Sequence, residues 1–163
     1  MYLNKIKFFE NIIFVILISL LLTNFAKADL IKPNSGIEPI QVVKIQLRGL
    51  KNNDQLYQDG GIEQTWEFAH PKNRKFTGPL TKFKSMIKGD DFSMLLNHKE
   101  HKVKEVFLSD DVATFEVIVL NSDKEYFKFK WQVEKFKKEG TLKNCWLTTA
   151  VSSPISIGSS ISC

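Results

Sequence analysis

The chain has 163 residues, of which 43% are hydrophobic, and a formal net charge of +5. This length suits a single domain with one hydrophobic core. Basic and acidic residues are interspersed, and the only basic run is Lys135–Lys138. The charge pattern therefore predicts a solvated surface of mixed charge and argues against a nucleic-acid partner.

The first 28 residues have the layout of a secretory signal peptide. Lys5 and Lys7 form a basic region, the run Ile12–Leu22 is apolar, and the small residues Ala26 and Ala28 precede a predicted cleavage after Ala28. The apolar run is too short to span a bilayer comfortably. We therefore expect export to a periplasm, the extracellular space or a thylakoid lumen, with no membrane attachment after cleavage. The alternative is an uncleaved N-terminal anchor.

The chain contains two cysteines, Cys145 and Cys163. In an oxidising compartment an even number permits a disulfide between them. Alternatively, Cys145 is a small buried hydrophobic residue in a predicted strand, and the terminal Cys163 pairs with another molecule. The sequence has no metal-ligand spacing such as Cys-x-x-Cys. We expect neither a metal ion nor a cofactor.

The first half of the predicted domain is helical. After a polar lead-in at 29–36, we predict a helix over Pro39–Asn52, because proline is favoured in a first turn and because its apolar residues recur every three or four positions. A short second helix is predicted over Ile62–Phe68. It ends at His70, since a residue that precedes proline is biased away from the α region.

A turn over Lys72–Gly78 is then predicted to lead into a third helix, Pro79–Ile87. From Phe92 onward the hydrophobic period changes from 3.6 to 2, which is typical of strands. Met94–Leu96 and His101–Leu108 form either one bent strand or two separate ones.

Three further strands are predicted over Val112–Leu120, Glu125–Lys135 and Cys145–Ser152. In the second of these, Trp131 falls on the apolar face and Lys130 on the polar face, so we expect the tryptophan to be buried and the lysine exposed. The order of elements predicts one α+β domain over 37–153, followed by a flexible tail at 154–163. Its three N-terminal helices pack on a curved antiparallel sheet of four to five strands. We expect a monomer or a homodimer.

This order of elements resembles the nuclear transport factor 2-like, cystatin-like cone fold. Three segments extend the resemblance, and they read Val42-Val43-x-Ile45-Gln46-Leu47-x-x-Leu50-x-x-Asn53-Asp54, Phe68-Ala69-His70-Pro71-x-Asn73-Arg74 and Gly78-Pro79-x-x-x-Phe83-x-x-Met86. They are similar to the family catalogued as domain of unknown function 4864, although His70 stands where a serine is expected and Gly49 where alanine is commoner. The resemblance covers about 37–153. It implies a fold but no activity and no catalytic residues.

Polar residues at the junctions between helices and strands are the candidate ligand-binding site. In a cone fold the open end lies where helices end and strands begin, which would place Trp66, His70, Arg74 and His98 near the mouth of a cavity. A histidine that titrates near neutral pH, beside a guanidinium group, suits an anionic ligand. The alternative is that His70 and Arg74 only satisfy backbone groups of the loop over 72–78.

A metal site at His98 is not expected. Residues of a strand alternate between its two faces, so His98 and His101 should point in opposite directions. His98 then shares a face only with Glu100, and two ligands are fewer than a zinc site requires.

The sequence favours a non-catalytic exported module that binds a small molecule or a protein. The alternative is a small lyase- or isomerase-like enzyme with an acid–base residue in the cavity, for which His70 is the candidate and Tyr57 and Asp54 are further ones. No nucleophile set and no phosphate-binding loop is recognisable.

Overall fold

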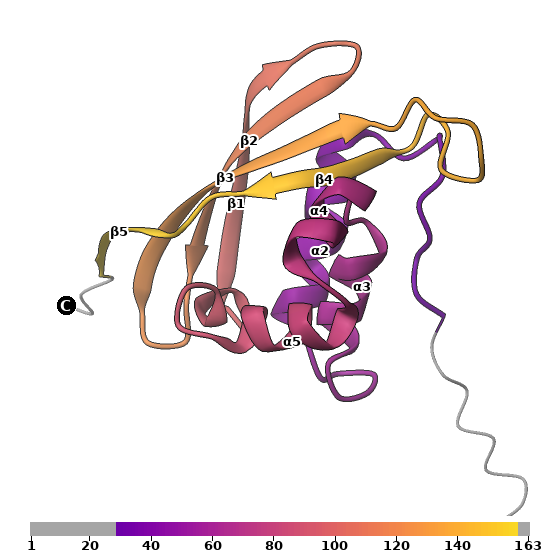
Figure 1. The fold of residues 1–163 in the computed structure, drawn as a ribbon. Coiled ribbons are helices and arrows are strands. Elements are labelled where there is room, and N and C mark those ends of the chain that lie inside the picture. The colour runs from indigo at the N-terminus through magenta and orange to yellow at the C-terminus, as the bar shows by residue number, and fades with distance from the viewer. Residues whose placement is uncertain (1–28, 160–163) are drawn as a thin grey trace, which may run out of the picture.

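The structure is a computed structural model that describes residues 29–159 (Figure 1). The predicted signal peptide, 1–28, and Cys163 lie outside these residues. In the described part, four α-helices and a short 3₁₀-helix, η1, precede a five-stranded sheet. The elements are α2 (Pro39–Lys51), α3 (Gly60–Glu67), α4 (Pro71–Thr77), α5 (Leu80–Lys88), η1 (Ser93–Leu95), β1 (Glu100–Leu108), β2 (Val112–Leu120), β3 (Glu125–Lys135), β4 (Trp146–Val151) and β5 (Ile155–Ser159).

The sheet is antiparallel and is built around β3. Its strand order is β1-β2-β3-β4, and β5 pairs with β3 as well. Residues Trp131–Lys135 of β3 pair with β4, whereas Glu125–Lys128 pair with β5. The sheet curves, and the helices lie against one of its faces (Figure 1). The prediction of an α+β protein with a curved antiparallel sheet is confirmed.

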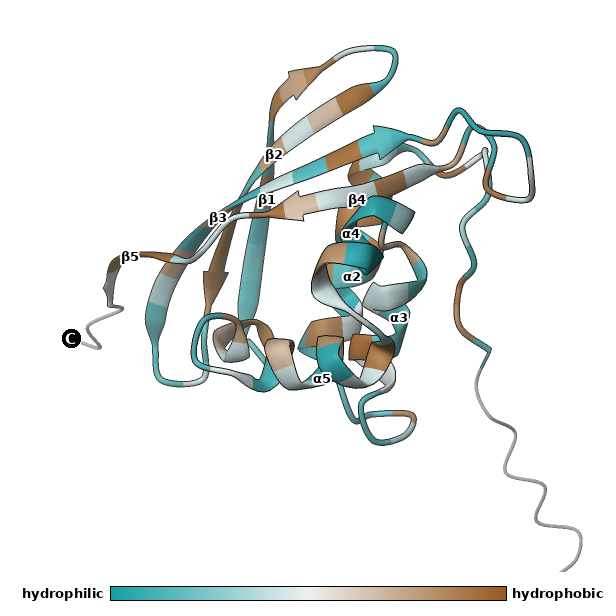
Figure 2. Cartoon of the chain, viewed as in Figure 1, coloured by the Kyte–Doolittle hydropathy of each residue, from teal (hydrophilic) through white to brown (hydrophobic). Residues whose placement is uncertain are grey.

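The hydrophobic core lies between α2 and the covered face of the sheet. Apolar and polar residues alternate along β3, as Figure 2 shows. Trp131 is only 1% exposed and Lys130 is exposed, as their positions in the strand predicted. The fully buried side chains that α2 contributes to the core are Val42, Val43, Leu47 and Leu50. Those that β2 contributes are Ala113, Phe115, Val117 and Val119.

Two glycines allow α2 and α3 to cross closely. A Cβ atom built on Gly61 would lie 1.9 Å from the carbonyl oxygen of Gly49, so any side chain at Gly61 would collide with the backbone of α2. The close crossing positions the buried face of α3 against α2.

The prediction of a turn over Lys72–Gly78 is wrong, because the chain forms helix α4 there. Pro71 occupies its first turn, where the missing backbone N–H costs nothing. The Nδ1 atom of His70 accepts a hydrogen bond from the backbone N–H of Lys72 at 3.0 Å and caps the helix. The described residues therefore form four α-helices and not three.

Two other segments differ from the predictions. Met94–Leu96 was predicted as a strand, but the chain forms the 3₁₀-helix η1 at this point. The tail was predicted to lack regular structure, yet it contains β5, whose residues are all exposed. The reason is that β4 covers only the second half of the long strand β3, which leaves backbone groups in the first half free to pair with β5.

None of the helices formed by residues 29–159 has both the length and the apolar character needed to cross a membrane.

Candidate functional site

A cavity of about 320 Å³ lies between the helices and strands β3 and β4. All four helices, η1 and the two strands contribute to its wall. Most lining side chains are apolar, and the largest of these are Leu50, Phe76, Phe83, Met86, Ile87, Phe92, Leu95 and Trp131. The polar ones are Gln46, Thr65, Asn73, Thr77, Thr148, Thr149 and Ser153. No ionisable side chain occurs among the described residues that line this cavity.

A hydrogen-bonded network forms the buried polar part of the wall. The Nε2 atom of Gln46 donates to the carbonyl oxygen of Thr65 at 3.0 Å. Its Oε1 atom accepts from the Thr148 hydroxyl at 2.6 Å and from the Trp131 indole N–H at 3.1 Å. These four residues are nearly fully buried. The polar side-chain atoms of the network therefore bind one another and need no ligand to satisfy them.

The cavity mouth is formed by the exposed lining residues Phe76, Ala150 and Ser153. Phe76 is 89% exposed, which is unusual for a phenylalanine. Asn73 lies one helical turn before it and is half-buried. Its Nδ2 atom makes a long hydrogen bond, 3.4 Å, to the carbonyl oxygen of Thr148. Because that carbonyl only accepts, the amide nitrogen faces it. The Asn73 Oδ1 atom makes no hydrogen bond to the described residues and, since none of their buried side-chain atoms lacks a partner, it reaches solvent at the cavity mouth.

Arg74 stabilises the end of α3. Its guanidinium group donates to the carbonyl oxygens of Trp66 at 2.7 Å, Glu67 at 3.0 Å and Ala69 at 3.1 Å. It also lies 5.0 Å from the centroid of the Trp66 ring. The carbonyls at a helix C-terminus lack hydrogen-bond donors within the helix, and the Arg74 guanidinium group supplies these donors. These three hydrogen bonds of its side chain all go to backbone groups.

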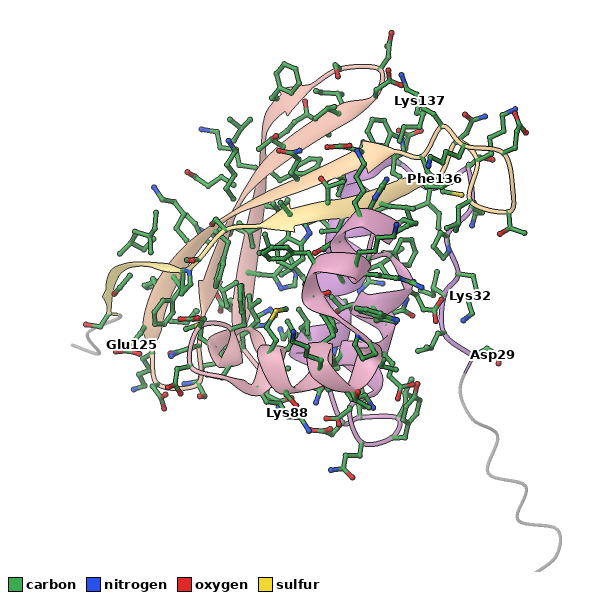
Figure 3. All side chains as sticks on the ribbon, in the orientation of Figure 1. Asp29, Lys32, Lys88, Glu125, Phe136 and Lys137 are labelled. Atoms are coloured by element: carbon green, nitrogen blue, oxygen red, sulfur yellow. The ribbon has the colours of Figure 1, made fainter. Side chains whose placement is uncertain are left out.

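His70 is buried between the end of α3 and the start of α4. Besides capping α4, its ring packs against Phe136, labelled in Figure 3, with 5.4 Å between the ring centroids. Burial lowers the pKa of His70 from its ordinary value, so the ring is neutral at neutral pH. The side chain acts here as a helix cap.

His98 and His101 contact each other, and the expectation that they point in opposite directions is wrong. His98 precedes β1, and Asn97 before it has a left-handed backbone, φ 52°, so the strand alternation does not apply to it. The Nε2 atom of His98 lies 2.7 Å from the Nδ1 atom of His101. Its own Nδ1 atom lies 2.7 Å from the carbonyl oxygen of Leu95. Since a carbonyl only accepts, His98 carries its proton on Nδ1 and accepts one from His101.

Among the described residues this histidine pair has no third metal ligand. Within residues 29–159 no group of three or more histidine, cysteine, aspartate or glutamate side chains has the arrangement of a metal site. Burial lowers the pKa of His98 to about 4. Burial also lowers the pKa of His101, and Lys51 and Arg48 of α2 add to that shift. The pair is therefore neutral near neutral pH.

The structure does not bring the four predicted site residues together. Trp66, His70 and Arg74 cluster where α3 meets α4, and His98 lies in the loop just before β1. None of the four is among the residues that line the cavity.

The other acid–base candidates also lie outside the cavity wall. The Tyr57 hydroxyl donates to Glu63 at 3.0 Å. Burial, followed by that hydrogen bond, raises the pKa of Tyr57 to about 12. Asp54 accepts a hydrogen bond from the backbone N–H of Asp59 at 2.8 Å in the loop between α2 and α3. Both residues therefore organise this loop.

The sequence did not predict the residues that give the cavity its polar character. One feature of the sequence could have indicated a buried polar site, because Gln46 is a polar residue within the apolar stripe of α2. Asn73 belongs to a segment that was predicted as a turn, whereas it lies in helix α4. Thr148 gave no signal of its own.

Cys145 is buried and its thiol is free among the described residues. Burial raises the pKa of this thiol. The predicted disulfide partner, Cys163, lies outside the described residues.

Comparison of the chain with models of protein families, with curated proteins and with solved structures finds no match in any of the three. The family resemblance and the cone fold therefore stay predictions from the sequence.

His70→Ala should destabilise the protein by about 1 kcal/mol, because the backbone N–H of Lys72 loses its acceptor. His70→Asn should keep most of the stability, since asparagine is a strong helix cap. Urea unfolding of both variants measures the difference. Equal losses in the two variants would show that packing on Phe136, and not the cap, is what His70 contributes.

Acid should destabilise the protein through His98. The unfolded chain takes up this proton near pH 6.5 and the folded chain near pH 4. The neutral ring therefore contributes its full stabilisation when the pH is above the pKa of His98 in the unfolded chain. This contribution is lost as the pH falls towards the pKa of His98 in the folded protein. This difference in pKa corresponds to about 3 kcal/mol of unfolding free energy.

Urea unfolding at a series of pH values tests this effect against the His98→Asn variant. Asparagine keeps a donor for Leu95 but does not titrate, so the variant should lose less unfolding free energy on acidification than the wild type. An identical pH dependence in both proteins would contradict the assignment.

Proposed function

We propose that the protein is an exported, non-catalytic module that binds a small molecule in the cavity between its helices and β3–β4. The observation that carries this proposal is the cavity itself. Its volume of about 320 Å³ falls within the range of roughly 300–1,000 Å³ typical of ligand sites. Such sites have mostly apolar walls with a few placed polar groups, and this wall has the same character.

The absence of ionisable groups in the described cavity wall favours binding over acid–base catalysis. A lyase- or isomerase-like reaction needs a residue that transfers a proton within hydrogen-bond reach of the substrate. His70, the first candidate, uses Nδ1 to cap α4. Tyr57 and Asp54 lie in the loop between α2 and α3. The enzymatic alternative thus has no proton-transfer group in this cavity.

The cone architecture and export belong to the same proposal. A curved sheet with helices on one face and a cavity between them supports the cone. The basic, apolar and small-residue layout of 1–28 supports export.

The uncharged fluorescent probe N-phenyl-1-naphthylamine tests for binding in the cavity. Its emission rises in apolar surroundings, so we expect saturable enhancement with the wild-type protein. Ala150→Trp places a large ring at the cavity mouth on an exposed position, and it should weaken binding by about tenfold or more, the loss of roughly 1.4 kcal/mol.

Ser156→Trp is the matched control, because Ser156 is exposed on β5 and does not line the cavity. It should bind the probe like the wild type. Undiminished binding by Ala150→Trp, or no saturable binding by the wild type, would overturn the proposed function.

A further inference from the structure

We infer that the ligand is an uncharged molecule with an apolar body and one polar end that donates a hydrogen bond, such as a hydroxyl or an amide, and that Asn73 receives this end at the cavity mouth. This inference rests on the proposed function and names the chemical class of its ligand.

The side chains that line the cavity indicate that the ligand is uncharged. None of the described lining residues is ionisable, so a carboxylate or an ammonium group inside the cavity would meet no opposite charge. It would lose its hydration without compensation, which is costly in an apolar site. The cavity therefore selects against ions of either sign.

The apolar body belongs in the buried part of the cavity. Gln46, Trp131 and Thr148 already bind one another there, and none of their buried side-chain atoms lacks a partner. A hydroxyl of the ligand beside this network would compete with bonds already made. The other buried polar side chains of the wall, Thr65 and Thr77, donate their hydroxyls to the backbone carbonyls of Gly61 and Asn73. The remaining buried side chains, including Phe83 and Ile87, are aliphatic or aromatic and favour a hydrocarbon surface.

The polar end belongs near Asn73. Its amide oxygen is an acceptor without a partner among the described residues, and its amide nitrogen makes only a long bond to Thr148. An acceptor at a half-buried position gains from a donor that a ligand supplies. A molecule with many hydroxyls, such as a sugar, would leave most of them unpaired against this wall.

The exposed ring of Phe76 fits the same placement. It lines the cavity from the turn of α4 that follows Asn73, and it is 89% exposed. An apolar ligand at the mouth would cover part of this ring, which removes apolar surface of both molecules from water.

Three probes of equal chain length separate charge from hydrocarbon content: 1-octanol, octanoate and octylammonium. The full-length sequence is expressed, and binding to the purified protein is measured by calorimetry at neutral pH. We expect 1-octanol to bind about tenfold or more tightly than either ion. A charged head group held against the half-buried Asn73 would give up part of its hydration and meet no opposite charge among the described lining residues.

Two variants test the role of Asn73. Asn73→Leu removes the acceptor and should weaken 1-octanol by about three- to tenfold, the worth of one neutral hydrogen bond. Asn73→Asp keeps an oxygen acceptor and adds a negative charge, so it should bind octylammonium about tenfold more tightly than the wild type does. Circular dichroism establishes that both variants fold.

The outcomes distinguish the inference from the proposed function. If octanoate or octylammonium matches 1-octanol and Ala150→Trp abolishes their binding, the cavity binds ligands but the inferred class is overturned. If Asn73→Asp folds but gains nothing for octylammonium, the polar end does not lie at Asn73. If none of the probes binds, including N-phenyl-1-naphthylamine, the proposed function itself fails.

Discussion

The side-chain amide of Gln46 joins α2 to three other elements of the fold. It donates to the backbone of α3 at Thr65 and accepts from Trp131 of β3 and Thr148 of β4. Its own exposure is 1%, so each of these bonds forms away from water. A buried polar group that loses its partner costs about 1–3 kcal/mol. The network therefore fixes the spacing between α2 and the sheet, and all four of its residues line the cavity.

Helices α3 and α5, which also line the cavity, are positioned by equally specific contacts. Gly61 permits the close crossing that places Thr65 of α3 beside α2. Helix α5 is attached to α3 and to the loop before it by the ion pairs Lys84–Glu63 and Lys88–Asp59, both at 2.8 Å. Lys88 is labelled in Figure 3.

Helix α4 contributes Asn73 and Phe76 to the cavity and is positioned by contacts at its start. Pro71 and the His70 cap begin the helix, and Arg74 binds the carbonyls at the end of α3. Two of the four residues that the sequence singled out as a site, His70 and Arg74, thus lie next to the cavity wall and orient the helix that carries Asn73.

Elements with a strong hydrophobic period could be predicted closely from the sequence. The bounds of β2 and β3 match the predicted ranges, and α2 differs by one residue at its end. Helix α4 was missed because 72–78 has no apolar stripe, and its helical form depends on a proline and a cap. Strand β5 was missed because it forms only where β3 offers an unused edge, which is a property of the folded sheet and not of residues 155–159.

The cavity could not be predicted for a related reason. Its lining residues come from all four α-helices of residues 29–159, from η1 and from two strands, so no single segment contains a motif for it. The junction residues were correctly placed where helices end, but the sequence does not show whether such residues face a cavity or the backbone. Arg74 and His70 face the backbone because the ends of α3 and the start of α4 present unpaired carbonyls and N–H groups there.

The most direct test of this account uses the three tryptophans of the chain as reporters. Each indole N–H gives its own nuclear magnetic resonance signal, which single Trp→Phe substitutions assign. Only Trp131 lines the cavity, whereas Trp66 lies beside Arg74 and Trp146 beside Lys135. On titration with 1-octanol the Trp131 signal should shift most. A shift at Trp66 with Trp131 unchanged, or no shift in any of the three, would contradict a ligand site in the cavity.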